Sequence, residues 1–131
     1  MDLIEKLLQV DKKKAAEKKK GTYNSKRIEN MVGDGTVKIT EIDPERISEL
    51  SAMMIDKKGD MDFSKTYNVA LMIAAEGITS PDLRDDRLKE HFGVHTATEL
   101  AKLLFAGEVT EIADAIQELG ECKVKDEEIK N

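Results

Sequence analysis

The stretch "VALMIAA", Val69 to Ala75, carries seven apolar residues in succession without a glycine or proline. A helix that is apolar most of the way round has to be surrounded by the rest of its protein. We therefore predict a helix from about Asp62 to Glu76 as the buried centre of the fold. Asp62 is placed to cap its start, and Gly77 to end it in a left-handed conformation.

Three more helices are predicted after this centre, because residues that start and stop helices recur along the chain. Ser80-Pro81 opens a short helix that Gly93 ends. The capping box "TATE", residues 96–99, opens the next one, and Gly107 separates it from the last. The apolar positions of the three are Leu83, Leu88 and Phe92, then Leu100, Leu103 and Leu104, then Val109, Ile112, Ala113, Ile116 and Leu119.

The sequence before the central helix predicts three more elements: one further helix of the domain, a β-hairpin and a separate short helix at the N-terminus. Asp43-Pro44 supplies an N-cap and a first-turn proline, opening a helix with Ile47, Leu50, Met54 and Ile55 on one face. The segments "KRIENMV" and "TVKITEI" flank "GDG", whose glycines suit the positive φ angles of a tight turn. This pattern predicts a β-hairpin over 26–42 with Val37 and Ile39 facing the helices. Leu3, Ile4, Leu7 and Leu8 recur at helical spacing and predict a short amphipathic helix.

These elements predict an α+β fold that is mostly α, with one compact domain of about four to five helices and a small N-terminal β-hairpin. The chain has 131 residues, the size of one domain, and no Trp, so its core must be largely aliphatic. We expect a short amphipathic helix and basic linker in residues 1–22, and the compact domain in 23–120, with its hairpin at 26–42 and its helices at 44–120. A charged, flexible tail is expected in 121–131.

The charge of the chain is divided unevenly. Nine Lys/Arg and four Asp/Glu fall in residues 1–27, whereas the rest holds twelve and twenty-three, so that a basic head precedes an acidic body and the sum is −6. A basic head could bind nucleic acid, but it has no interleaved aromatic residues and the acidic body would repel phosphate. We favour a solvated lysine segment.

Composition also bears on the compartment. The single cysteine, Cys122, excludes an internal disulfide framework and fits a reducing environment. No apolar run has the length of a membrane span, and the N-terminus lacks the pattern of a secretory signal. The expectation is a soluble, cytoplasmic protein.

The loop "DKKGDMDFSKTY", Asp56 to Tyr67, resembles a calcium-binding loop in its alternating acidic residues. Such a loop needs oxygen ligands at positions one, three and five, glycine at six and glutamate at twelve. Counted from Asp56, position three holds Lys58, position six holds Met61 in place of glycine, and position twelve holds Tyr67 in place of glutamate. The interpretation we favour is a connector between two helices that binds no metal.

Other chemical motifs are equally weak. His91 and His95 have the spacing of zinc ligands on one helical face, but Gly93 interrupts the helix between them and no further ligand completes the set. Acidic pairs such as Asp85-Asp86 fall on polar helix faces. With no phosphate-binding loop or nucleophile motif, we predict no catalytic residue, no metal site and no cofactor.

Apolar surface is the remaining candidate for function. Met53, Met54 and Met61 cluster around the loop, with Met72 on the next helix; they either form an adaptable binding surface or fill gaps in the core. The first helix could dock into a groove, or pack on its own domain or a sister subunit. The candidate contact residues are Leu3, Ile4, Leu7 and Leu8, with Leu104 and Phe105, which precede the break at Gly107 and could be uncovered there.

The segment 74–119, "AAEGITSPDLRDDRLKEHFGVHTATELAKLLFAGEVTEIADAIQEL", resembles the C-terminal half of the small tail assembly chaperones of phages and Bacillus prophage-like elements. The opening "MDLIEKLL" and the region of "GDG" are similar more loosely. A departure is "FAGEV", where relatives often have proline before the glycine and this chain has Ala106.

The resemblance implies a binding role. Such chaperones hold the tape measure protein, a long helix-rich chain, in solution until the tail tube forms, and then leave. It implies a protein of the bacterial host cytoplasm that is absent from the mature virion, with the tape measure protein and other tail proteins as partners. The sequence leaves open whether the chain also forms a homo-oligomer. The alternatives are a small nucleic-acid-associated regulator that uses the basic head and a structural tail component.

Overall fold

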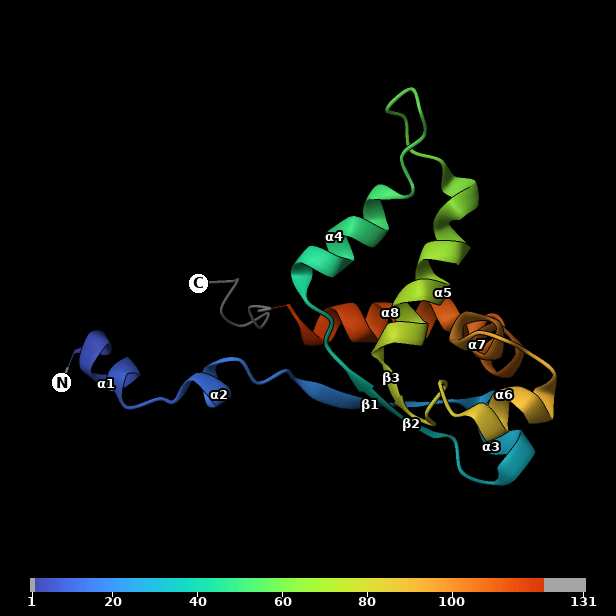
Figure 1. Cartoon of the computed structure of the whole chain (residues 1–131), viewed down its shortest axis with the longest axis horizontal. Coiled ribbons are helices and arrows are strands. Elements are labelled where there is room, and N and C mark those ends of the chain that lie inside the picture. Colours follow the sequence, from blue (N-terminus) through green and yellow to red (C-terminus); the bar gives the residue numbers. More distant parts are fainter. Residues whose placement is uncertain (1, 122–131) are drawn as a thin grey trace, which may run out of the picture.

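The computed structural model describes residues 2–121 and has α5 (Thr66–Gly77) at its centre (Figure 1). This is the predicted core helix, entered through a 3-10 turn, η1 (Phe63–Lys65), which Asp62 caps by accepting the N–H of Ser64. α5 contacts α4 (Pro44–Ala52), α7 (Ala97–Phe105) and α8 (Glu108–Leu119). Its residues Val69, Ala70, Leu71, Ile73, Ala74 and Ala75 are all buried.

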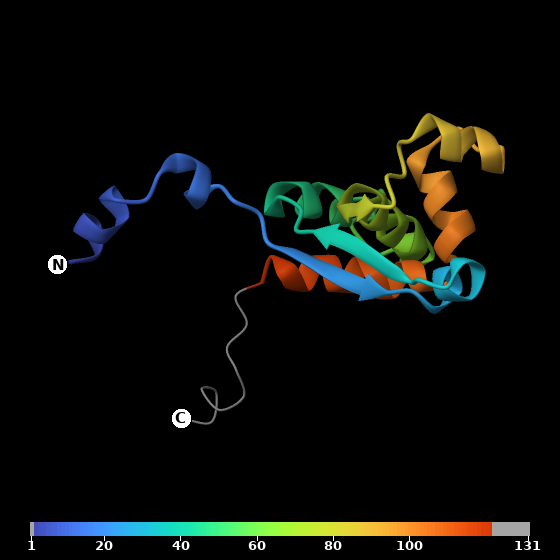
Figure 2. The ribbon, with the colours of Figure 1, turned by 90° about the horizontal axis from the view of Figure 1, so that it is seen from below.

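A three-stranded antiparallel sheet completes the domain, in the order β1 (Lys20–Asn24), β2 (Thr36–Thr40), β3 (Ile78–Ser80). Helix α8 contacts β1 and β2, so the helices cover one face of the sheet and the other face is open (Figure 2). On β2 the side chains alternate as the pleat requires: Val37 and Ile39 are buried against the helices, as predicted, and Lys38 is exposed. The fold is mostly α with a small β part.

The predicted hairpin over 26–42 is wrong in its first strand. "KRIENMV" is helix α3 (Lys26–Val32), and the strand that pairs with β2 is β1, which begins at Lys20 within the predicted linker. The helix has clear end residues: Ser25 accepts the N–H of Ile28 at its start, and Gly33 ends it with a φ of 89°. Gly35 is not left-handed. It lies against Ser25, whose carbonyl oxygen would be 2.1 Å from an added Cβ.

Gly77 also has a different role from the one predicted. It is the last residue of α5 and has no positive φ, and the chain continues directly into β3 through Ile78. A Cβ at Gly77 would lie 2.4 Å from Cδ1 of Ile116 on α8. Glycine is needed here because α5 and α8 approach closely, not because the helix ends in a turn.

The outer elements complete the described chain. The predicted N-terminal helix is α1 (Leu3–Leu8), and a helical turn, α2 (Lys12–Ala15), lies in the lysine segment; both extend away from the domain (Figures 1 and 2). α6 (Asp86–Phe92) begins later than predicted, because Asp85 rather than Ser80 caps it. None of the described helices is long and apolar enough to span a membrane. Cys122 and the predicted tail after Glu121 lie outside the described residues.

Candidate interaction surfaces

The loop after α4 folds into a short hairpin-like projection. Ile55 and Met61 pair in an antiparallel bridge, and the Asp56 carboxylate accepts the N–H groups of Lys58 and Asp60. Both hydrogen bonds are accepted by Oδ1 of Asp56, which thus stabilises the turn at Gly59, where φ is 86°. Over residues 2–121 the structure groups no three His, Cys, Asp or Glu side chains that could hold a metal ion.

The projection carries an exposed apolar cluster that we call the tip: Met53, Ile55, Met61 and Phe63. The side chain of Phe63 is 77 % exposed, and the other three are about half exposed. The bridge places Ile55 and Met61 next to each other, because paired residues of neighbouring strands project to the same side. The loop between α4 and α5, which carries the tip, stands at the top of the view in Figure 1. A local cluster of this kind is typical of a protein-binding surface.

A shallow pocket continues the tip along the domain. Met53 belongs to both, and the rest of the pocket wall comes from η1, α5 and α7. The lining is Met53, Lys65, Asn68, Val69, Leu71, Met72 and Thr98. The two methionines are unbranched and can adapt to the shape of a bound side chain. The tip and this pocket together form one mainly apolar surface.

The four N-terminal contact candidates are placed together by α1. Leu3, Ile4, Leu7 and Leu8 are between 58 % and 80 % exposed, and α1 has no buried residue. Asp2 caps the helix by accepting the N–H of Glu5. The helix thus presents its apolar face to solvent at the end of a lysine-rich arm (residues 2–19).

The other two contact candidates are not on the surface. Leu104 is 7 % exposed and Phe105 is completely buried, so the prediction that the break at Gly107 uncovers them is wrong. α7 ends at Phe105, and the next residue, Ala106, has a φ of 47° that turns the chain so that α7 and α8 pack on each other with both side chains inside. The structure does not bring this pair near α1, and Leu103, beside them, is the half-exposed residue.

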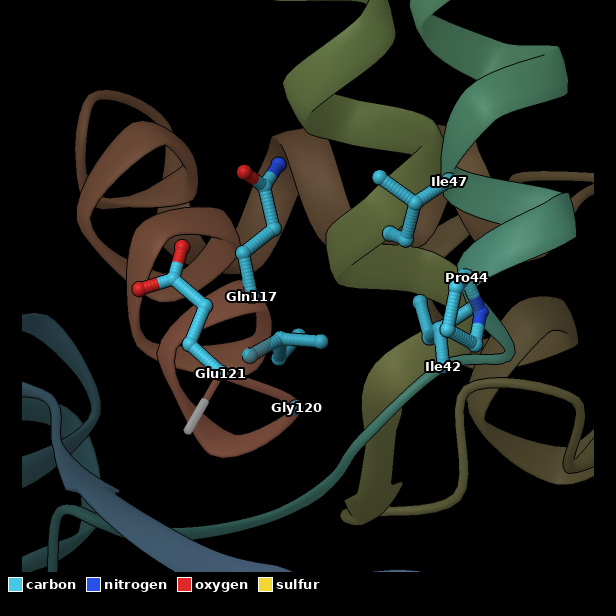
Figure 3. A pocket seen from close by; sticks show the side chains of 7 residues that line it. Ile42, Pro44, Ile47, Gln117, Gly120 and Glu121 are labelled. Carbon is cyan, nitrogen blue, oxygen red and sulfur yellow. The ribbon is translucent and has the colours of Figure 1, made fainter. Parts of the chain in front are cut away.

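Besides the pocket beside the tip, a groove lies where α4 begins and α8 ends, and we call it the end groove (Figure 3). Ile42, Pro44 and Ile47 form one wall; Ile116, Gln117, Gly120 and Glu121 form the other. In Figure 3, Ile47 faces Gln117 across the opening. No sequence pattern predicted this groove, because its walls come from segments about seventy residues apart that only the fold brings together.

Hydrogen bonds and an ion pair join the helices and strands that lie between these surfaces. The Arg46 guanidinium binds both oxygens of the Glu76 carboxylate, with the shortest distance 2.6 Å, and joins the start of α4 to the end of α5. Ser25 is fully buried and donates to Glu108, which also accepts the N–H of Lys26. Burial raises the pKa of Tyr23, and its hydrogen bond to the Glu111 carboxylate acts in the same direction. The contacts of Ser25, Lys26 and Tyr23 thus join β1 and α3 to α8.

His91 and His95, the two candidate zinc ligands, lie on either side of a helix end. α6 stops at Gly93, which has a φ of 69°, and the His91 ring packs edge-on against Phe92. At the start of α7, Thr96 accepts the N–H of Glu99, which is one half of the predicted capping box. The Glu99 carboxylate accepts the N–H of His95, one residue before the N-cap, rather than that of Thr96.

Comparison with known families decides what kind of protein has these surfaces. Residues 4–130 match the family described as phage XkdN-like tail assembly chaperone protein. The chain belongs to this family. The match covers nearly the whole sequence, including α1 and the arm, and confirms the resemblance seen in the sequence. The family is one of phage chaperones and not a class of enzymes.

Two further comparisons complete the picture. A search of curated proteins finds no match. Among solved structures, the crystal structure of the protein yqbn is similar with a TM-score of 0.54 and 19 % sequence identity, over 77 % of this chaperone and 85 % of that chain. At this identity the similarity supports the fold alone.

Proposed function

We propose that this chaperone binds the tape measure protein of a phage or prophage tail and keeps it soluble until the tail tube assembles. Membership of the tail assembly chaperone family is the observation that carries the proposal. The exposed apolar surfaces support it, because a long helical client that has not yet assembled exposes apolar side chains that must be covered. The role needs no catalytic residue.

The tip and its pocket are the proposed primary contact. An amphipathic helix could place apolar side chains against Met53, Ile55, Met61 and Phe63, with Met72 in the adjoining pocket. The apolar face of α1, with Leu3, Ile4, Leu7 and Leu8, is the proposed second contact. Leu104 and Phe105 have no part in this proposal because both are buried. The chaperone acts in the host cytoplasm and is absent from the finished virion, and other tail proteins are secondary partners.

Co-expression with the tape measure protein encoded nearby tests the proposal. The client should be soluble with the wild-type chaperone and largely insoluble without it. Replacing two tip residues, Ile55→Asp with Phe63→Asp, should return the client to the pellet. Val32→Asp is the matched control, since Val32 is 72 % exposed on α3, away from the tip. Failure of the wild-type chain to keep the client soluble would contradict the proposed function; equal effects of tip and control variants would contradict the proposed contact.

The two alternatives predict different results. Apolar contacts should survive a rise in salt that would remove a lysine-rich arm from nucleic acid. A structural tail component would be recovered in purified particles, whereas an assembly chaperone would not.

A further inference from the structure

We propose that two copies of the chain exchange their N-terminal arms, with α1 of each copy lying in the end groove of the other. The proposal concerns the free chaperone and does not depend on the identity of the client. It begins from α1, whose four large apolar side chains are exposed with no part of the helix buried. A six-residue helix gains little stability alone in water, so its apolar face favours an apolar surface on which to dock.

The end groove offers such a surface. Pro44 and Ile47 are its accessible apolar residues, the buried Ile42 and Ile116 line it from the core side, and Gln117 and Glu121 lie at the rim (Figure 3). The groove is bounded by the first turn of α4 and the last turn of α8. The apolar pairs of α1, Leu3 with Ile4 and Leu7 with Leu8, are one helical turn apart, which is the arrangement that docks a helix into a groove.

Charge favours the same pairing. The arm carries Lys6, Lys12, Lys13, Lys14, Lys18 and Lys19, whereas acidic residues flank the groove lining: Glu41 and Asp43 on either side of Ile42, Glu118 beside Gln117, and Glu121 in the lining itself. Opposite charges on the two surfaces speed the encounter and fix the orientation of docking.

The root of the arm lies at the same end of the domain as the groove. Gly21 lies against Leu119 near the end of α8, and a surface depression joins Leu119 to residues 17–20. The eleven residues between α1 and β1 (9–19) can span up to about 40 Å when extended. An arm from a second copy placed against this end can therefore reach the groove.

The direction of the arm selects a second copy rather than its own domain. The N–H of Lys19 donates to Glu41, and the N–H of Glu41 donates to the carbonyl of Lys19, so the root is held as a continuation of β1. From this root the arm runs outward from its own domain (Figures 1 and 2). Two copies related by a two-fold axis would each send the arm across to the partner, the geometry of domain swapping. A client helix that engages α1 must then displace the exchanged arm.

Sedimentation equilibrium of the full chain, with two kinds of variant, tests the exchange. The wild type should be a dimer at high concentration. Leu7→Glu with Leu8→Glu on the arm should weaken dimerisation by more than about tenfold per leucine, because each loses its burial. Ile47→Glu, and separately Gln117→Lys at the groove rim, should also weaken it. Val32→Glu, on the exposed face of α3, should not.

Mixing decides between exchange and other arrangements. The variant carrying Leu7→Glu and Leu8→Glu keeps an intact groove, and the Gln117→Lys variant keeps an intact arm. In a mixture, the intact arm of the second variant should dock into the intact groove of the first. The mixture should therefore form a heterodimer, whereas each variant alone should not dimerise. Circular dichroism melts of each variant establish that it is folded; Gln117→Lys serves if Ile47→Glu is not. A monomeric wild type, a dimer unaffected by the arm substitutions, or a mixture of folded variants that stays monomeric would overturn the proposal.

Discussion

Gly77→Ala tests the contact on which the arrangement of the domain depends. The added Cβ would lie 2.4 Å from Cδ1 of Ile116 and 2.9 Å from its Cγ1 and Cγ2. Ile116 is completely buried and cannot move its side chain into solvent. Overpacking of this kind costs about 1–3 kcal/mol. Alanine regains less than about 1 kcal/mol of helix propensity at the end of α5, so the net loss of stability should be about 1–2 kcal/mol.

The matched control is Gly107→Ala, at the start of α8. A Cβ there meets nothing within 4 Å, and the residue has a φ of −66° that any amino acid adopts. This change should leave the free energy of unfolding unchanged or raise it by up to about 1 kcal/mol, because alanine lowers the conformational entropy of the unfolded chain. Urea unfolding followed by circular dichroism measures both variants.

A double-mutant cycle identifies the cause. Ile116→Val removes the methyl group nearest to the new Cβ and alone should cost about 0.5–1.5 kcal/mol. In the Gly77→Ala background it should cost less, since it relieves the overlap. If Gly77→Ala is as stable as Gly107→Ala, or if the two changes at the contact are additive, the close approach of α5 and α8 is wrong.

The remaining predictions concern the core, one helix cap and the loop. Leu71→Ala should lower the free energy of unfolding by about 2–5 kcal/mol, whereas Lys65→Ala, on the exposed start of the helix, should change it little; equal small effects in denaturant melts would show that the burial is wrong. The hydrogen bonds from Arg87 lower the pKa of the Asp85 carboxyl to about 2, below its unfolded value of about 3.9, so its contribution to stability is complete above about pH 5 and is lost as the pH falls from about 4 to 2. Asp85→Asn keeps an N-cap residue but removes this titration, so the stability difference from wild type should shrink over that range, and a constant difference would contradict the assignment. Calorimetric titration with calcium should be flat, because Asp56 already accepts two backbone N–H groups and a lysine occupies the third ligand position; a saturable site lost in Asp56→Ala would refute this.

The helical part of the fold was predictable because each helix has its own local boundaries. The capping box at Thr96, the proline after Asp43 and the glycines at 93 and 107 act within one turn of the chain, and the structure starts or ends helices close to each. The run from Val69 to Ala75 is buried apart from Met72, which is partly buried, because a helix that is apolar most of the way round has to be covered by the rest of its protein.

The sheet was less predictable because strand pairing joins residues that are distant in sequence. β1 contains lysine, glycine and asparagine and shows no apolar alternation, since only Tyr23 and Gly21 face the helices. Its strand identity comes from its pairing with β2. For α3, by contrast, its position beside "GDG" predicts a strand, and the signals that distinguish it as a helix are the cap at Ser25 and the left-handed Gly33.

The interaction surfaces show the same division. The exposed face of α1 follows from its spacing alone, and the methionines near the loop pointed to the tip. The end groove depends on how the start of α4 and the end of α8 come together. The burial of Leu104 and Phe105 depends on how α7 and α8 pack after Ala106, the one residue other than glycine with a positive φ among those the structure describes. That turn is not encoded in any local pattern.

The most direct test of the central claim is the soluble yield of the nearby-encoded tape measure protein when it is co-expressed with the wild-type chaperone, the tip variant carrying Ile55→Asp and Phe63→Asp, or the Val32→Asp control. The account predicts a soluble complex with the wild type and the control, and a client in the pellet with a tip variant whose melting curve is unchanged. A client that is insoluble with the wild type, or that remains soluble with the folded tip variant, would contradict it.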